Sequence, residues 1–262
     1  MINNKNWISW LIGFIDAEGN FQIFPKKRVL TSSKIARYNV GYSFHLSLHN
    51  RDSSIIKDIK NKLGVGVIYE YKNKPDCRLA VNKKSDLLYL IDNIFDKYPL
   101  ITKNQSIRYY LLKNGIINNI VEFKTLEEYE NYKTNILSSS KAYALEDLQN
   151  NKNISIDNWI IGFINGEGCF YLKKNKCNFI IEHTDKQALD LIKNRLCFGP
   201  SVLERSLRDR DIGKIRKTTY QLNISSKKDI ESLVMLLDNN ENIPLQGNKY
   251  IQYVNWKEHI NK

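Results

Sequence analysis

Apolar and polar positions follow two different periods along the chain, and each period predicts a type of element. Continuous apolar runs over residues 7–17 and 159–166 predict two buried helices. Apolar side chains at every second position over residues 38–48 predict a strand with one buried face. Apolar spacing of three and four residues over 55–63 and 189–196 predicts a packed helix in each half of the chain.

The same order of elements is expected in each half. Alternating segments predict a later hairpin in each half, formed by residues 65–71 with 78–81 and by residues 201–207 with 219–224. We therefore predict the order α-β-β-α-β-β-α for each half, which is an α+β fold with an antiparallel sheet. Residues 115–155 hold no strand pattern and predict a tether that contains a charged helical stretch.

An internal repeat accounts for this doubled order. The segments WLIGFIDAEGNF and WIIGFINGEGCF are identical at eight of twelve positions and lie 149 residues apart. Two weaker pairs follow in the same order, LGVGVI with LCFGPSV and YPLITKN with IPLQGNK. Such a long offset indicates a duplicated domain. We therefore divide the chain into an N-terminal half over residues 1–114, a linker over 115–155 and a C-terminal half over 156–262.

Small residues recur four positions apart in both copies of the repeated helix, as Gly13 with Ala17 and as Gly162 with Gly166. Residues at this spacing share one helix face, and small side chains let two helix backbones approach closely. The alternative is a buried amphipathic helix with incidental glycines, but an interior glycine costs about 0.5–1 kcal/mol relative to alanine. We therefore expect the two helices to pack on each other about a pseudo-twofold axis.

Each copy of this helix ends in a glutamate. Glu18 and Glu167 occupy the last helical position, directly before Gly19 and Gly168, which suit the left-handed position after a helix. Two close carboxylates repel each other, and a helix C-terminus disfavours anions. A divalent cation that prefers oxygen ligands removes both penalties, so the paired acids predict a metal site. The competing interpretation is a solvated glutamate used twice.

Composition limits the class of protein. The 262 residues are 42% hydrophobic and 26% charged, which is typical of a folded globular protein and not of a disordered chain. No apolar run approaches the roughly 18 residues that a membrane span requires, so we expect no membrane partner. The four cysteines show no CxxC spacing, which predicts reduced, intracellular thiols in place of a zinc site or a disulfide framework.

The formal net charge of +12 is spread over both halves, with +7 over residues 1–150 and +5 over residues 151–262. A basic excess over the whole body favours an extended polyanion as partner, above all nucleic acid. Two alternatives stay open on charge alone. The lysines can form a solvated surface, or an A/T-rich codon bias can raise Lys, Asn and Ile without any binding role.

The repeated segments carry a family resemblance. WLIGFIDAEG and WIIGFINGEG resemble the two signature helices of a monomeric LAGLIDADG homing endonuclease, and the similarity extends through SFHLSLHNRD, LGVGVIY and YPLITKN over most of the chain. The resemblance implies a pseudo-dimer whose two saddle-shaped antiparallel sheets straddle the DNA major groove. It also implies a site-specific endonuclease that hydrolyses both strands of a long asymmetric double-stranded DNA target across the minor groove and leaves short 3′ overhangs.

The resemblance further implies a metal site. The last motif acid of each helix binds divalent metal in the family, which corresponds to Glu18 and Glu167 here, and the preceding carbonyls of Ala17 and Gly166 assist. Mg²⁺ is the expected cofactor, with Mn²⁺ as a substitute and Ca²⁺ as an ion that binds without supporting cleavage.

A basic residue near the later helix of each half organises the attacking water in the family, and the nearest matches are Lys103 and Lys249, four and five residues after a proline. Many members also carry a glutamine on the second strand, where this chain has Leu48 and Glu182. Strand residues that face away from the helices are the candidates for DNA contact, because Gln, Asn and Arg match base edges while Lys and Ser hold phosphates. These candidates are Gln22, Phe24, Lys26, Arg28, His45, Ser47, Tyr69, Lys72, Arg78, Lys173, Asn178, Arg205, Arg208, Arg210, Arg216 and Gln221.

Two other functions stay open. One is an RNA maturase that assists splicing of its own intron, which makes intron RNA a second partner, and the other is a DNA-binding regulator without cleavage. Retention of both Glu18 and Glu167 favours the enzyme over the regulator. We expect a monomer with internal pseudo-twofold symmetry, of mitochondrial origin on the grounds of A/T-biased residue usage and of the family.

Overall fold

The computed structural model describes residues 4–29, 36–71, 74–139, 153–205 and 218–260. Packing divides the chain into two compact units, the first built from residues 1–2 and 18–144 and the second from residues 3–17 and 145–262. The N-terminal helix therefore packs with the second unit, although it precedes the first in the sequence. The half boundaries expected at 114/115 and 155/156 stay a prediction. No helix in the described part of the chain has both the length and the apolar character to cross a membrane.

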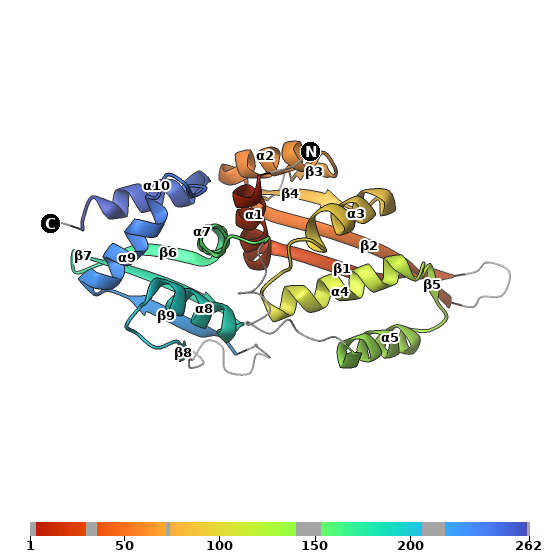
Figure 1. The fold of residues 1–262 in the computed structure, drawn as a ribbon. Helices are drawn as coiled ribbons and strands as arrows, with labels where there is room; N and C mark the ends of the chain where they lie inside the picture. The colour runs from red at the N-terminus through yellow and green to blue at the C-terminus, as the bar shows by residue number, and fades with distance from the viewer. Residues whose placement is uncertain (1–3, 30–35, 72–73, 140–152, 206–217, 261–262) are drawn as a thin grey trace. The chain divides into compact units, whose positions relative to one another are not determined.

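The first unit contains an antiparallel sheet with the strand order β1-β2-β4-β3, in which a two-residue strand, β5, also pairs with β2 (Figure 1). The strands are β1 (Gly19–Val29), β2 (Ala36–His49), β3 (Val67–Glu70), β4 (Asp76–Val81) and β5 (Glu122–Phe123). The sequence gives no sign of β5 because two residues are too few to show a period.

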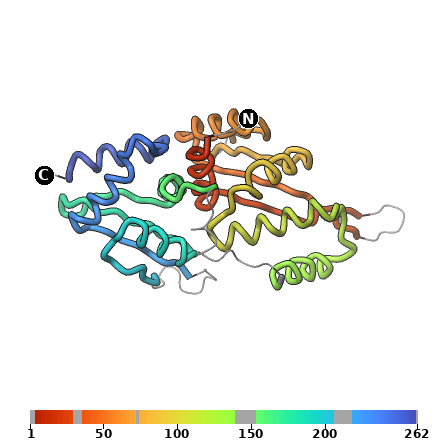
Figure 2. The backbone as a smooth tube through the Cα atoms, viewed as in Figure 1, coloured from red at the N-terminus to blue at the C-terminus, as the bar shows by residue number. Residues whose placement is uncertain are grey.

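Helices cover one face of this sheet, and α4 lies along β1 (Figures 1 and 2). The helices of the unit are η1 (Asn50–Asp52), α2 (Ser53–Leu63), α3 (Lys84–Leu90), the π-helix η2 (Ile91–Phe95), α4 (Lys103–Ile117) and α5 (Leu126–Ser139). Between helices and sheet, the ring of Phe21 contacts those of Phe44, Phe95 and Tyr109 at centroid distances of 4.9–5.6 Å. This aromatic cluster is the core of the unit and fixes β1 and β2 beneath α4.

Part of the expected tether is packed structure. The hydroxyl of Tyr129 in α5 donates to the carbonyl of Ile23 in β1 at 2.9 Å, and that of Tyr132 donates to Leu111 in α4 at 2.8 Å. Residues 126–139 are therefore attached to the first unit, and the remaining tether residues 140–152 lie outside the described residues.

The second unit repeats the plan with the sheet order β6-β7-β9-β8. Its elements are α1 (Lys5–Glu18), α7 (Ile156–Glu167), β6 (Gly168–Lys173), β7 (Lys176–His183), α8 (Lys186–Leu196), β8 (Leu203–Glu204), β9 (Tyr220–Ile224), α9 (Lys227–Leu237) and α10 (Gly247–Lys257). The core again centres on an aromatic cluster, in which Phe170 contacts Phe179, Tyr253 and Trp256 at 4.9–5.4 Å. The expected order α-β-β-α-β-β-α is confirmed for both halves.

The repeated helices α1 and α7 pack backbone against backbone through their glycines. A Cβ atom at Gly13 would lie 2.8 Å from the carbonyl carbon of Trp159 and 3.0 Å from the amide nitrogen of Phe163. The reciprocal contact repeats this geometry, since a Cβ atom at Gly162 would lie 2.8 Å from the carbonyl carbon of Trp10. The glycine face predicted from the sequence is thus the contact between the two helices.

The prediction that Gly19 and Gly168 adopt a left-handed conformation is wrong. Gly168 has an extended backbone with φ −70° and ψ 145°, and Gly19 is not among the positive-φ glycines of the described chain. Both begin strands. At position 168 a side chain would meet the carbonyl oxygen of Ile164 at 2.7 Å and the ring of Phe179 at 3.0 Å. Close approach of neighbouring atoms, and not backbone handedness, therefore requires glycine at 168.

Candidate active site and nucleic-acid interface

The two motif acids end their helices in equivalent places. Glu18 is the last residue of α1 and Glu167 the last residue of α7, and each lies five residues beyond the glycine at which the helices cross. At 1.5 Å per residue this places each acid roughly 7.5 Å along its helix from the crossing. Both side chains are half-buried.

The residues two positions before the acids form buried hydrogen bonds at the motif helices. Asp16 is 1% exposed, and its carboxylate accepts a hydrogen bond from the indole Nε1 of Trp159 at 2.8 Å. Its counterpart Asn165 accepts instead from the backbone amide of Gln246 at 2.5 Å. The equivalent indole nitrogen of Trp10 is buried without a hydrogen-bond partner. The acid at position 16 is therefore explained by a buried hydrogen bond across the helix contact.

The first carbonyl after each acid accepts a hydrogen bond from a long side chain of the later helix. In the second unit, the ammonium group of Lys249 donates to the carbonyl of Gly168. In the first unit, the amide of Gln105 donates to the carbonyl of Gly19, while Lys103 is the first residue of α4. Lys249 thus contacts the residue that follows its motif helix, and Gln105 is the residue that sequence reasoning missed.

The start of each later helix identifies Gln105 as the equivalent of Lys249. The N-cap residues of the two later helices are Thr102 and Gln246, and Gln105 and Lys249 each follow their N-cap by three positions. Counting five residues from Pro99, as from Pro244 to Lys249, leads instead to Asn104, and Lys103 is the nearest basic residue. Gln105 is 7% exposed, and its Oε1 atom is buried without a hydrogen-bond partner.

Each motif helix ends in oxygen atoms of the kind that bind a metal ion. Glu18 and Glu167 offer carboxylates, and Ala17 and Gly166 offer peptide carbonyls. Among the residues that the structure describes, no group of three or more His, Cys, Asp or Glu side chains gathers to enclose a metal ion. A carboxylate and a carbonyl at each helix end are oxygen ligands of the kind that Mg²⁺ takes, since Mg²⁺ keeps several waters and takes further oxygens from substrate phosphates. This donor set does not fit a closed zinc site.

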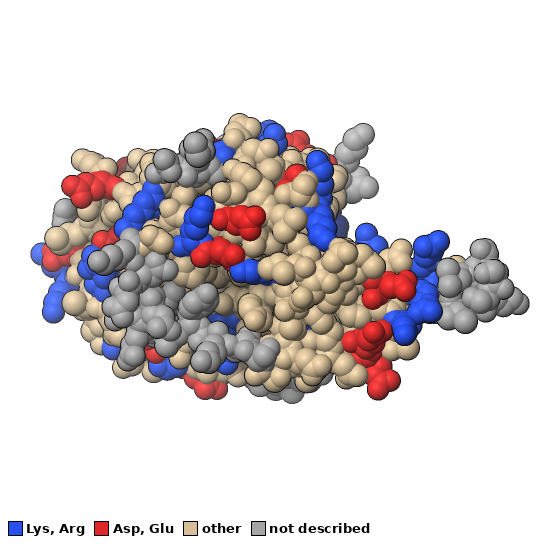
Figure 3. All heavy atoms as spheres, turned by 45° about the vertical axis from the view of Figure 1, so that its right-hand side comes forward, with Lys and Arg blue, Asp and Glu red and all other residues tan. Residues whose placement is uncertain are grey.

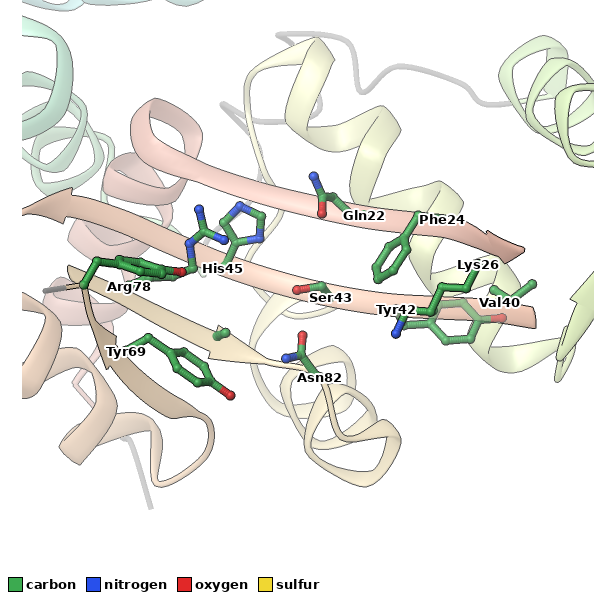
Figure 4. A pocket seen from close by; sticks show the side chains of 13 residues that line it. Gln22, Phe24, Lys26, Val40, Tyr42, Ser43, His45, Tyr69, Arg78 and Asn82 are labelled. Carbon is green, nitrogen blue, oxygen red and sulfur yellow. The ribbon is translucent and has the colours of Figure 1, made fainter. Parts of the chain in front are cut away.

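The face of the first sheet that is turned away from its helices is hollowed. The hollow has a volume of about 540 Å³, and the described residues that line it include no Asp or Glu. Six of the residues predicted to contact DNA line it, as Figure 4 shows: Gln22, Phe24, Lys26, His45, Tyr69 and Arg78. Acids are common elsewhere on the surface, since Figure 3 shows Lys and Arg interspersed with Asp and Glu on the face that it draws.

Arg78 is held in place at one end of this hollow. Its Nε donates to the hydroxyl of Ser47 on β2 at 2.8 Å, and its guanidinium lies 5.8 Å from the ring centroid of Tyr71. The imidazole of His45 lies beside it (Figure 4). Burial lowers the pKa of His45, and the charge of Arg78 lowers it further. The hollow therefore combines a fixed cation with a neutral imidazole near pH 7.

Phe24 and Lys26 form the other end of the hollow. The ring of Phe24 lies over Gly41, where a Cβ atom would come within 2.6 Å of it. The ammonium group of Lys26 lies 5.1 Å from the centroid of the same ring. Gly41 therefore makes room for an aromatic side chain on an otherwise polar face, and that ring in turn supports a cation.

The corresponding face of the second sheet is organised around an acid. Glu182 forms an ion pair with Arg205, and its other oxygen accepts from the hydroxyl of Thr219 at 3.0 Å. Gln221 pairs with Glu182 in the strand register. Asn178 is 6% exposed and donates to the carbonyl of Lys176 at 2.9 Å, so it is less accessible than predicted.

The other predicted contacts are less informative. Arg28 and Lys173 are exposed on β1 and β6. Four more predicted contacts lie outside the described residues, namely Lys72, Arg208, Arg210 and Arg216.

The strand register corrects one expected equivalence. Gly19 pairs with Leu46 in the first sheet, and Gly168 pairs with Ile181 in the second. Because the two glycines are equivalent in the repeat, the residue equivalent to Glu182 is Ser47 and not Leu48.

Similar sequences cover both copies of the repeat. A family model described as LAGLIDADG endonuclease matches residues 11–116 and 160–260. Probable intron-encoded endonuclease Cox1-I1b of Schizosaccharomyces pombe is 28% identical over 267 residues, which cover 98% of this chain and 65% of that protein. Uncharacterized mitochondrial protein RF1 of Saccharomyces cerevisiae is 31% identical over 196 residues, which cover 72% of this chain and 37% of that protein. The chain thus spans less than two thirds of the length of either relative.

Solved structures share the fold. A crystal structure of the LAGLIDADG meganuclease I-CpaMI bound to uncleaved DNA matches with a TM-score of 0.71 and 21% identity, over 96% of this chain and 90% of that one. The I-LtrWI LAGLIDADG homing endonuclease bound to target DNA matches with a TM-score of 0.72 and 21% identity, over 98% and 91%. The duplicated α+β fold expected from the sequence is therefore confirmed.

Proposed function

This chain belongs to the LAGLIDADG endonuclease family, and on that basis we propose that it is a site-specific endonuclease that hydrolyses both strands of a long asymmetric DNA duplex. One observation carries the proposal. The family match covers both copies of the repeat, and in both copies an acid ends the helix that packs through its glycine. A binding protein has no physical reason to keep a carboxylate at both helix C-termini, where the helix dipole disfavours it.

The proposed cofactor is Mg²⁺, with Mn²⁺ as a substitute. Glu18 and Glu167 would hold the metal through carboxylate oxygens, with the carbonyls of Ala17 and Gly166 as further donors. A metal held in this way stabilises charge on the phosphate oxygens and aligns a water for attack. The family fold and the purely oxygen donor set support this assignment.

The side chains around the acids position the reaction. The hydrogen bond from Lys249 to Gly168 fixes an ammonium group next to the residue that follows Glu167. We assign Lys249 to orient the attacking water and to balance charge beside the phosphate. Lys103 keeps the same proposed role in the other half, and the amide of Gln105 fixes the Gly19 carbonyl there.

The polar sheet faces supply the DNA contacts in this proposal. A hollow lined by Arg78, Lys26 and His45 and free of acids suits a polyanion. A two-stranded ribbon has the dimensions to enter the major groove, and β1 with β2 forms a ribbon eleven register pairs long. Short 3′ overhangs, action as a monomer and a mitochondrial location complete the proposal, the last supported by the mitochondrial name of the RF1 relative.

Glutamine substitutions test the proposed function. Duplexes bound by the wild-type chain in Ca²⁺ are first selected from a random DNA library and then presented in Mg²⁺ in a supercoiled plasmid. We expect linear product from the wild type, and only background cleavage from Glu18→Gln and Glu167→Gln, with binding in Ca²⁺ retained. Glu127→Gln is the matched control, because Glu127 is an exposed acid of α5 far along the chain from either motif. Full cleavage by either motif variant would refute the metal assignment.

The same experiment distinguishes the endonuclease from the two alternative functions. Selective DNA binding by the wild type without cleavage in Mg²⁺ or Mn²⁺ would identify a DNA-binding protein on this fold. A wild type that selects no duplex but accelerates splicing of an intron RNA would identify a maturase. Each of these results would replace the endonuclease proposal.

A further inference from the structure

We propose that Arg78 determines target specificity by reading one guanine through its two Nη groups, in an orientation set by Ser47 and Tyr71. This inference deepens the proposed function and rests on it, since it names a base that the first half of the target contains.

Three constraints fix the guanidinium of Arg78. Its strand β4 pairs with β2 on one side and with β3 on the other, so the backbone at Arg78 has hydrogen-bonded neighbours on both edges. Its Nε is committed to the hydroxyl of Ser47 at 2.8 Å, and the ring of Tyr71 lies 5.8 Å away. A side chain held in this way has already lost most of its rotamer freedom, so little ordering entropy is lost on binding.

Because Nε of Arg78 donates to Ser47, the two Nη groups are the donors that remain for contact with a base. Within the described part of the chain, neither Nη1 nor Nη2 of Arg78 is hydrogen-bonded to an acceptor, and no carboxylate forms an ion pair with it. Guanine presents two adjacent acceptors in the major groove, O6 and N7, and paired N–H donors match them. Adenine presents an acceptor beside a donor at the same edge, so the geometry selects against it.

The surroundings of Arg78 preserve its charge and its selectivity. The lining of the hollow contains no acid, so nothing in it neutralises the guanidinium. His45 lies beside Arg78 (Figure 4), and its lowered pKa keeps it neutral near pH 7. A neutral imidazole adds one donor and one acceptor without a second charge. The neighbourhood therefore reads base edges better than a cluster of cations, which would attract phosphates of any sequence.

The second unit has Gln221 at the register position of Arg78, and its nearby arginine has the opposite electrostatic surroundings. Glu182 is equivalent to Ser47, and it forms an ion pair with Arg205, the residue that follows β8. There the guanidinium is neutralised by a carboxylate, whereas Ser47 holds Arg78 without removing its charge. Base discrimination by a held arginine is accordingly assigned to the first half, and Arg205 is not expected to add an equal preference.

Binding to single-base variants tests the inference. Starting from a duplex selected by the wild type in Ca²⁺, every single base pair is substituted, and the affinities are compared by competition. We expect one G·C pair in one half of the site whose replacement weakens wild-type binding roughly 10- to 100-fold. With Arg78→Ala and Arg78→Lys, substitution of that pair should weaken binding only a few-fold, while the preferences at all other positions remain. Ser47→Ala should give an intermediate loss, because it releases the guanidinium without removing it.

Controls separate base reading from other roles. Arg51→Ala is the matched control, because Arg51 is an exposed arginine that contacts Asp52 on the short helix η1, and it should leave every base preference unchanged. If Arg78→Ala weakens all duplexes equally and lowers the salt slope by about one, Arg78 holds a phosphate and the inference is wrong. Unchanged preferences in both Arg78 variants would also overturn it. A wild type that selects no duplex at all would overturn the proposed function itself, which distinguishes the two failures.

Discussion

Replacing Gly13 by alanine tests the helix contact on which the second unit depends. The added Cβ would lie 2.8 Å from the carbonyl carbon of Trp159 and 3.0 Å from the amide nitrogen of Phe163, and closer still to the Trp159 carbonyl oxygen. All three are backbone atoms of α7, which no rotamer change can move aside. The only relief is a separation of α1 from α7.

The magnitude follows from two opposing effects. Alanine favours a helix interior over glycine by about 1 kcal/mol. Overpacking costs about 1–3 kcal/mol where side chains can adjust, and more where they cannot. A gap of 0.5–1 Å already forfeits a quarter to a half of each dispersion contact. With packing loss at about 3–4 kcal/mol, the net loss of unfolding free energy for Gly13→Ala is about 2–3 kcal/mol.

Urea denaturation followed by tryptophan fluorescence measures this loss. Gly162→Ala should cost about as much, because its Cβ would meet the Trp10 carbonyl in the same way. The double variant should cost less than the sum, since one separation of the helices relieves both contacts. Gly199→Ala is the control, where the nearest atoms are the Asp229 carboxylate oxygens at 3.8 and 3.9 Å, and it should stay within about 0.5 kcal/mol of wild type. Unchanged or increased stability of Gly13→Ala would refute the close packing of the helices.

Three further predictions concern single side chains. Trp159→Phe removes the indole donor to buried Asp16 and should lower the unfolding free energy by roughly 1–3 kcal/mol in the same assay. Burial lowers the pKa of His183, although nearby Asp185 raises it in part, so the unfolded chain takes up a proton below pH ~6.5 before the folded chain does. As the pH is lowered from 7.5 to 5.5, the stability of the wild type should therefore fall more than that of His183→Asn. The asparagine keeps an acceptor for the Asp185 amide. Equal slopes of melting temperature against pH would contradict this prediction. Lys249→Met should slow cleavage of one strand about 100-fold and accumulate nicked plasmid, whereas equal slowing of both strands would argue against a role confined to one half.

The elements that the sequence predicts well are those with a repeated signal. The apolar runs of the two motif helices and the spacing of Ile55, Ile56, Ile59 and Leu63 each specify burial over several turns, and all four of these side chains are buried. Strand β5 was missed because a two-residue strand has no period. The conformation of Gly168 was predicted wrongly because a glycine after a helix has two physical explanations, handedness and close contact, that sequence does not distinguish.

The site was predictable where a residue type repeats and not where partners come from different strands. Glu18 and Glu167 follow from the repeat alone. Gln105 was missed because a lysine two positions earlier matched the expected chemistry, and only the helix start shows which residue reaches Gly19. The pair of Glu182 with Arg205 depends on the register of three strands and on a fold that brings distant segments together. Spacing along the chain contains no such information.

The order in which the chain is synthesised conflicts with the order in which it packs. Helix α1 emerges before its partner α7, whose motif follows 149 residues later, which at usual rates of translation is a delay of roughly 7–30 s. During that interval the apolar surface of α1 lacks its packing partner. A nascent or truncated N-terminal half therefore exposes an apolar helix that can pair with another copy of itself. The chain avoids this self-association only once its second copy of the motif has been made.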